Sequence, residues 1–575
     1  MKNLRLLLAC AIALATAFLA VSCSKTPAPE TFTGQLDNID GAMFFVSLQH
    51  PKLVVRGINK LTAEIPEASA LNMLLAGYGG RFGYPEFSDI APGTNIGVYM
   101  PAMTLDELKR GKPSLSPVLF IKLKENGKIW NTLVNQAGME ARKHGDWAMF
   151  AQNTADFDAV KNPDAIIARL SAPQAENLRV WACLNGDTAA AYKTLLNDAI
   201  AKALDNARDK DLLDDAGKTA FTAYTRVLLD EFLSSTHSAH ATLNLGDNGL
   251  RLAFGAQFKP DTATGTLLRY RADATPAVAQ YIPNDALYSG VVRFTPKALN
   301  DYNNHLLDLI LKVDYPPVSE PLAKFKQDTA SYYEQMDGCG AVTVNMDMNL
   351  DFKNPRASKN IPDAFYVYSG KFDERGLKPL RTAFDFLQKF MTRFFAFARA
   401  NLRSDVPKLT ITNKPGAATI DGHNFDMLTL DITGAKANMA PINYYYGVAG
   451  GNLIIATQKD TLQKRLPALL AKKTQPDNVA AANPLQPYEQ MNLGFNGAAL
   501  ADMICKTAKI DLTDADAQAT IAGIKESYKQ AGPARFTLEA RQAGATFAMD
   551  IPYKFITDSV QLGRYIYSVK NTAGE

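Results

Sequence analysis

Four stretches of the chain recur in the same order in its second half. Each pair keeps an apolar run and a few identical residues at matching places, such as Asn185-Gly186 and Asn496-Gly497. The pairs are residues 40–54 with 285–299, 145–160 with 451–466, 173–190 with 484–501, and 241–254 with 536–549. A single match of this kind is weak, but four in one order predict an internal duplication, in which both copies have to form the same fold.

The predicted copies cover residues 34–270 and 280–560. In each copy short apolar runs often follow one another directly, and segments with helical spacing lie between groups of them. Strands that follow strands favour antiparallel pairing, because a parallel pair requires a long crossover connection. The sequence therefore predicts an α+β fold with two tandem similar modules. Each module is expected to be a largely antiparallel sheet with helices packed on one face.

The dipeptides His50-Pro51 and Thr295-Pro296 mark the expected helix starts in the two copies. Proline lacks an N–H group and loses no hydrogen bond at the first position of a helix. The polar residue before it is suited to capping the helix. Each dipeptide follows an apolar run, so both copies are expected to begin with a strand and then a helix.

The second copy holds an insertion, because the spacing between matched segments grows from 245 residues at the first pair to 306 at the second. The extra residues fall in a helical segment after Asp373 and in a hairpin after Lys408. The helical segment, residues 376–403, is rich in Phe and in basic residues, and its apolar positions have helical spacing. We favour a helix that covers a sheet as part of the core. The alternative is an apolar-ligand groove, lined by Phe384, Phe390, Phe394 and Phe397.

Residues 1–22 have the composition of a secretory signal peptide. Lys2 and Arg5 precede an apolar stretch that is too short and too rich in Ala to span a membrane. The run Leu19-Ala20-Val21-Ser22-Cys23 resembles the lipobox of bacterial lipoproteins, in which the signal is cleaved before the Cys and the Cys is acylated. An ordinary signal peptide that happens to contain Cys23 is the alternative. Residues 23–33 are then expected to form a tether, and acyl chains on Cys23 would hold the protein on a membrane.

A lipobox followed by repeated strand–helix units, which start at Asp40 and Gly145 and again at Asp285 and Gly451, is similar to the large uncharacterised envelope lipoproteins of Gram-negative bacteria. The resemblance covers most of the chain after Cys23. It implies an outer-membrane protein that is anchored by lipid and faces the periplasm or the cell surface, with an envelope protein as a potential partner. It carries over no catalytic residues.

Composition argues against several other classes of function. The formal net charge is +3, and two of the basic residues belong to the predicted signal peptide, so there is no excess of positive charge for nucleic acid. Cys183, Cys339 and Cys505 are isolated and are expected to be buried thiols, although whether any two of them pair stays open. No zinc-protease or nucleophile-elbow motif occurs. We therefore expect no metal, no cofactor and no nucleic acid.

Three functions remain after these observations. The first is binding or assembly in the cell envelope without catalysis. The second is a carrier or binder of an apolar ligand such as lipid. The third is a hydrolase whose triad is assembled from distant parts of the chain, which a sequence does not exclude. Residues 561–575 are expected to form a C-terminal tail.

Overall fold

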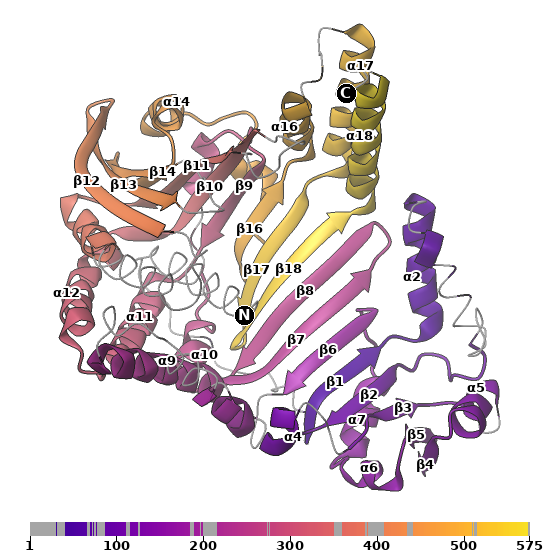
Figure 1. The fold of residues 1–575 in the computed structure, drawn as a ribbon. Helices are drawn as coiled ribbons and strands as arrows, with labels where there is room; N and C mark the ends of the chain where they lie inside the picture. Colours follow the sequence, from indigo (N-terminus) through magenta and orange to yellow (C-terminus); the bar gives the residue numbers. More distant parts are fainter. Residues whose placement is uncertain are drawn as a thin grey trace.

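The computed structural model describes residues 41–65, 87–110, 115–124, 127–183, 189–195, 215–272, 276–349, 359–385, 408–433, 441–508 and 514–572, with a few single residues and short pieces between them. These residues form a mixed fold of helices and strands on one large antiparallel sheet (Figure 1). The predicted signal peptide and Cys23 lie outside the described residues.

The first half of the chain contributes strands β1 to β8 to this sheet. Their bounds are β1 (Ala42–Leu48), β2 (Ile96–Pro101), β3 (Val118–Ile121), β4 (Glu140–His144), β5 (Trp147–Ala151), β6 (Leu178–Cys183), β7 (Thr236–Leu245) and β8 (Gly249–Phe258). The helices of this half are α2 (Pro51–Glu64), α4 (Leu105–Arg110), α5 (Lys128–Asn131), η3 (Thr132–Gln136), α6 (Thr154–Asp158), α7 (Pro163–Ser171), α9 (Asp215–Ser235) and α10 (Ala263–Leu267).

The second half contributes strands β9 to β18. Their bounds are β9 (Tyr288–Arg293), β10 (Met336–Asn349), β11 (Lys359–Gly370), β12 (Lys408–Ile420), β13 (His423–Thr433), β14 (Ile442–Ala449), β15 (Asn452–Ala456), β16 (Glu489–Phe495), β17 (Ala534–Arg541) and β18 (Gly544–Pro552). The helices are η4 (Ala277–Tyr281), α11 (Pro296–Leu311), α12 (Pro316–Tyr333), α14 (Lys459–Leu470), α15 (Val479–Ala482), α16 (Gly497–Ala508), α17 (Ala515–Ala531) and α18 (Tyr553–Thr572). Helix α18 runs across residue 560, where the C-terminal tail was expected to begin.

The strands of the two halves pair in the same order, and every pair is antiparallel. From the middle of the sheet outward, the first half runs β8, β7, β6, β1, β2, β3, β5, β4. The second half runs β18, β17, β16, β9, β10, β11, β15, β14 and then continues with β13 and β12. The additional hairpin β12–β13 lies between β11 and β14 in the chain, which is where the spacing between the matched segments increases.

The halves are joined by the pairing of β8 with β18, which lie side by side in the middle of Figure 1. Ala253 lies opposite Ala548 at the centre of this pairing, and Phe254 lies opposite Phe547. The matched residues Gly249 and Gly544 lie at the two opposite ends of the β8–β18 pairing. Gly249 precedes Ala253 by as many residues as Gly544 precedes Ala548. The pairing therefore has local two-fold symmetry, as in the self-complementary interface of a homodimer.

The predicted helix starts at Pro51 and Pro296 are confirmed. His50 caps α2, because its Nδ1 atom accepts a hydrogen bond from the Lys52 backbone N–H at 3.2 Å. Thr295 precedes Pro296 with an extended backbone, but its side chain makes no capping hydrogen bond. In both places a strand ends only a few residues before the helix, as the apolar runs indicated.

Helices contact both faces of the sheet in the outer part of the second half, whereas one covered face was expected. Ile454 of β15 packs in a cluster with Leu466 of α14, while its neighbour Leu453 packs in a different cluster with Tyr332 of α12. Adjacent strand residues point to opposite faces, so the two clusters lie on opposite sides of the sheet. These strands are interior to the fold, and both of their apolar faces have to be buried.

Candidate functional site

The central strands carry an open apolar surface, which we call the apolar face. Successive side chains of a strand point to opposite faces, so every second side chain of each central strand lies on this face. The residues that pair across neighbouring strands show which of the two sets it is. The row is apolar on every central strand: it contains Val46 of β1, Val180 of β6, Leu243 of β7, Leu252 and Phe254 of β8, Phe547 and Met549 of β18, Leu538 of β17 and Met491 of β16.

The centre of the apolar face is exposed. Phe254 keeps 59% of its surface exposed and Phe547 keeps 39%, although both stand in the middle of interior strands. Phe547 also stacks on Phe536, with ring centroids 6.2 Å apart. Burying a side chain of this size stabilises a protein or a complex by about 1.5–3 kcal/mol. An exposed apolar surface that continues over several strands is therefore typical of a binding site.

The other face of the flanking strands is covered. Phe45 of β1, Trp181 of β6 and Asn492 of β16 are almost fully buried, whereas their neighbours on the apolar face are only partly buried. On β8 and β18 this other face is polar, and Arg251 contacts Asp550 at 2.8 Å and Glu539 at 3.5 Å. The sheet thus has one covered or polar side and one open apolar side at its centre.

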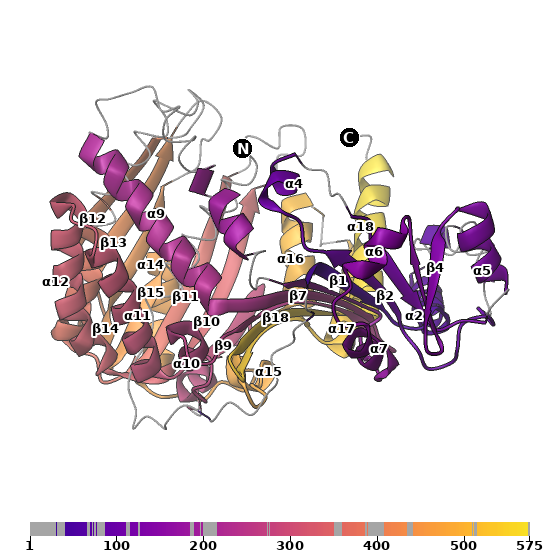
Figure 2. The same ribbon diagram turned by 90° about the horizontal axis from the view of Figure 1, so that it is seen from below.

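Helices limit the apolar face at one end of the strands. Phe495 and Ile551, which belong to the face, pack in a cluster with Phe555 of α18 and with residues of α16 and α17. Gly57 of α2 lies so close to Leu245 that a Cβ atom on it would be 2.9 Å from the Leu245 Cβ. Figure 2 shows α16 and α18 beside the central strands, and α9 leading into β7.

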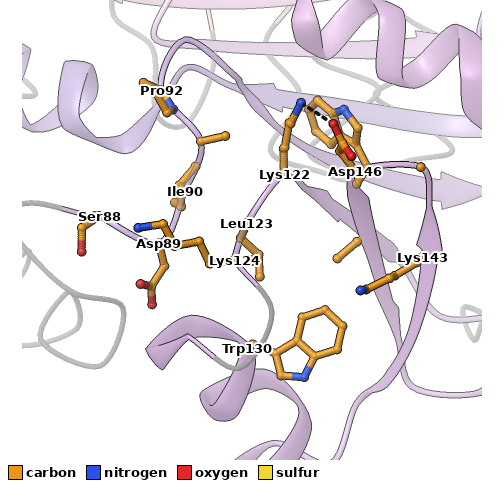
Figure 3. A pocket seen from close by; sticks show the side chains of 14 residues that line it. Ser88, Asp89, Ile90, Pro92, Lys122, Leu123, Lys124, Trp130, Lys143 and Asp146 are labelled. Carbon is orange, nitrogen blue, oxygen red and sulfur yellow. Dashed lines mark hydrogen bonds and ion pairs between the residues drawn. The ribbon is translucent and has the colours of Figure 1, made fainter.

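A separate pocket of about 500 Å³ lies in the outer part of the first half (Figure 3). Segments that follow β3 and precede β5 form its walls, and Trp130 of α5 closes one side. The lysines around it are Lys122, Lys124 and Lys143. Lys122 pairs with Asp146 at 3.2 Å, and Figure 3 shows the Lys143 side chain directed into the space above Trp130.

The chemistry of this pocket is that of a small cationic cleft. Asp89 is engaged with the start of α5, because its carboxylate accepts a hydrogen bond from the Ile129 backbone N–H at 3.2 Å. Trp130 is held by an edge contact with Phe150 at 5.3 Å. The polar side chains of its lining are those of Ser88, two Asp and three Lys, and the lining includes neither His nor Cys.

The residues predicted for the alternative groove are only partly covered by the structure. Phe390, Phe394 and Phe397 lie outside the described residues, as does Cys23. Phe384 is half-buried and makes an edge contact with Tyr446 of β14, with ring centroids 5.0 Å apart. Phe384 therefore contributes to the core of the second half.

The three cysteines Cys183, Cys339 and Cys505 are buried free thiols. Burial raises the pKa of the Cys339 thiol, against a hydrogen bond with Ser369 that lowers it. Burial also raises the pKa of Cys505. Thiols of this kind are unreactive at neutral pH.

Other features of the described residues offer no alternative site. No group of three or more His, Cys, Asp or Glu side chains is arranged for a metal ion in the part of the chain that the structure describes. None of the helices described there is long and apolar enough to cross a membrane. His144 contacts Asp164 at 2.7 Å at the surface, and His305 contacts Glu231 at 3.2 Å between α11 and α9.

Sequence reasoning missed the apolar face, although a signal for it was present. The matched segments 241–254 and 536–549 alternate between apolar and polar residues, which predicts one apolar side. That this side stays open depends on where the helices lie.

Comparison of the chain with protein-family models, with curated proteins and with solved structures found no match in any of the three.

Proposed function

We propose that this chain is a lipid-anchored envelope protein that binds the acyl chain of a lipid on the apolar face. The observation that carries the proposal is the exposure of Phe254 and Phe547 at the centre of a face that is apolar on every central strand. It joins two of the expected functions, binding without catalysis and binding of an apolar ligand. It moves the binding site from the Phe-rich segment to the centre of the sheet.

An acyl chain suits this surface better than a peptide strand does. Both backbone edges of β8 and of β18 are already hydrogen-bonded to neighbouring strands, so no free edge is available there for an added strand. Among the described strands, the side chains at the centre of the face are apolar and offer a peptide group no hydrogen bond. A hydrocarbon chain has no such groups and gains from burial alone.

The two-copy architecture belongs to this proposal. The identical pairing order of the two halves and the symmetric β8–β18 register support it, together with the matched segments. In this view an ancestral module paired with itself through its last strand, and fusion of two copies made that pairing permanent. The apolar face then lies across the symmetry axis, because Leu252–Met549 and Phe254–Phe547 flank the Ala253–Ala548 pair.

The location rests on the sequence. The lipobox-like run before Cys23 and the resemblance to envelope lipoproteins support an acylated Cys23 and the outer membrane of a Gram-negative bacterium. Intact mass of the membrane-extracted protein tests the acylation. A Cys23→Ala variant that remains in the membrane fraction as strongly as the unchanged protein would contradict it.

Binding of a fluorescent fatty acid tests the ligand. We expect saturable binding by the unchanged protein and roughly tenfold to hundredfold weaker binding by Phe254→Ser, because the lost contact is worth about 1.5–3 kcal/mol. The matched control is Tyr567→Ser, since Tyr567 is 71% exposed on α18, away from the face. Absence of binding by the unchanged protein, or equal losses in both variants, would refute the proposal. Dimerisation that Phe254→Ser abolishes would instead assign the face to a second copy.

A further inference from the structure

The start of the mature chain is fixed to one end of the central sheet. The Glu30 backbone N–H donates to the Arg269 carbonyl oxygen at 2.9 Å, and Arg269 Nη1 donates to the Glu30 carbonyl oxygen at 3.2 Å. Arg269 follows α10, which in turn follows the end of β8. We call this end of the sheet the α10 end.

The proposed lipid anchor is therefore close to the α10 end. Only seven residue steps separate Cys23 from Glu30. A chain reaches at most about 3.6 Å per residue, so the acylated Cys lies within about 25 Å of the Glu30–Arg269 contact. The tether is too short to let the opposite ends of the strands face the bilayer.

Exposed arginines lie at the same end. The guanidinium groups of Arg271 and Arg541 stand 5.8 Å and 4.4 Å from the ring centroid of Tyr488, and both side chains are exposed. Arg541 precedes the turn into β18, and this turn contacts the end of β8, because the Phe258 backbone N–H donates to the Ala543 carbonyl oxygen at 2.8 Å. Guanidinium groups bind phosphate oxygens in a bidentate manner.

Apolar side chains are also exposed on α9, the helix that leads into β7. Leu228 and Phe232 are 40% and 51% exposed, and they lie one helical turn apart on α9. The last turn of α9 is tied to the α10 end, since the Lys259 backbone N–H donates to the Ser235 carbonyl oxygen at 2.7 Å. Basic groups combined with exposed Leu and Phe are typical of a surface that lies on a bilayer.

We infer that the α10 end is the membrane-facing surface of this protein, with Arg271 and Arg541 binding the phosphates of lipid headgroups. The inference rests on the proposed acylation of Cys23 and deepens the proposed function. The apolar face extends along β8 and β18 to this end, so an acyl chain leaving the leaflet has a short path to Phe254. Phe232 inserts into the interfacial layer of the bilayer, and the two arginines fix the orientation of the protein on the membrane.

The orientation is tested with the acylated full-length mature protein in vesicles. Lys259→Cys and Lys529→Cys form a matched pair, because both lysines are exposed and α17, which carries Lys529, lies at the opposite end of the strands. A fluorophore is attached to the introduced cysteine of each variant, and the vesicles carry a quencher on their lipid headgroups. We expect strong quenching of the fluorophore at position 259 and little quenching of the one at position 529. Equal quenching, or stronger quenching at 529, overturns the inference. If the acylated protein does not associate with vesicles at all, the lipid anchor on which the inference rests is contradicted instead.

The headgroup contact is tested without the anchor, in the full-length Cys23→Ser protein. We expect it to bind vesicles that contain anionic lipid, with an affinity that falls as salt is added. Arg271→Ala and Arg541→Ala should each weaken binding about fivefold. Arg564→Ala, an exposed arginine on α18, should leave it unchanged. Equal losses in all three variants, or no binding to anionic vesicles, would overturn the role of the arginines. Competition by inorganic phosphate at millimolar concentration would assign them to free phosphate.

Discussion

The outer ends of the two halves are built on the same strand order but are finished differently. In the first half the last of the described strands is β4, whose side chains are mostly charged and exposed. In the second half the corresponding strand, β14, is followed by the additional strands β13 and β12. A charged edge resists pairing with other chains, and an added hairpin covers the edge directly. The two halves therefore meet the same requirement in different ways.

A second difference concerns the segments that follow β3 and precede β5, which form walls of the pocket in Figure 3. At the corresponding place in the second half, after β11 and before β15, Phe372 is buried and its backbone N–H donates to the Gly451 carbonyl oxygen at 2.8 Å. The first half has a pocket at this place, whereas the second half has the buried side chain of Phe372. The centre of the sheet, by contrast, is built alike by both halves, which is why we place the common function there and regard the ends as free to differ.

The largest expected effect tests whether the two halves unfold as one unit. Phe120 of β3 and Phe425 of β13 are both fully buried, and truncation of each to Ala should cost about 3–5 kcal/mol. Because the sheet continues through the β8–β18 pairing, both variants should lower the temperature of a single unfolding transition in calorimetry. Two transitions, each moved by only one variant, would show that the halves unfold separately.

The contrast between the hollow and the filled end predicts unequal losses. Phe372→Ala removes a buried side chain from the core and should cost about 3 kcal/mol or more. Leu123→Ala removes a partly buried wall of the pocket and should cost about 1 kcal/mol, because that side chain already lacks neighbours on the pocket side. Chemical denaturation measures both values. Similar losses at the two places would remove the contrast.

The symmetric seam is tested by enlarging one alanine. Ala548 is fully buried at the centre of the β8–β18 pairing, so Ala548→Leu should destabilise the protein by about 1–3 kcal/mol through overpacking. Ala545 stands three residues earlier on the same strand but on the apolar face, where it is only partly buried. Ala545→Leu is the matched control and should change stability by less than about 0.5 kcal/mol. The prediction fails if the two variants lose equal stability.

Acid should weaken a contact that belongs to the second half. Burial raises the pKa of Asp285, but Arg465, which contacts it at 2.7 Å, and Lys464 outweigh burial, so the pKa lies below its ordinary value. A lowered pKa in the folded state gives stability that is present above the ordinary value and is lost as the pH falls through the lowered pKa. Asp285→Asn should therefore flatten the loss of stability below pH 4. An unchanged acid profile would contradict this assignment.

The smallest expected effect concerns the lysine pocket. The Lys122–Asp146 pair is solvent-exposed, so Lys122→Ala should change stability by less than about 1 kcal/mol. Thermal unfolding in low and high salt would show the change, and high salt should reduce it further. A loss of several kcal/mol would mean that the pocket wall is part of the core of the first half.

Several parts of the fold could be predicted because they depend on neighbouring residues. Pro51 and Pro296 begin helices, as expected from the missing N–H group of proline. Asp421-Gly422 is a hairpin turn with φ angles of 48° and 78°, and this dipeptide favours that conformation. The matched segments predicted a duplication, which stays a prediction that the common pairing order supports. The acylation of Cys23 also stays a prediction.

The candidate site was harder to predict, since burial is a property of the assembled molecule. The Phe-rich segment was selected for its composition, yet the one described residue of the predicted groove, Phe384, packs in the core. Phe254 and Phe547 stand in ordinary alternating strands and attract no notice in the sequence. Whether such a row is buried or open depends on helices that lie far away in the chain.

The sequence by itself determined that the chain mixes strands with helices, that helices begin at Pro51 and Pro296, and which side of the alternating strands is apolar. These properties follow from backbone geometry and side-chain periodicity over a few residues. Only the tertiary structure decided that β8 meets β18, that the two apolar rows join there, and that none of the helices among the described residues covers Phe254 at their centre. Alternation defines the faces of a strand but not its neighbour, because the partner strand lies some three hundred residues away and is selected by the packing of the whole sheet.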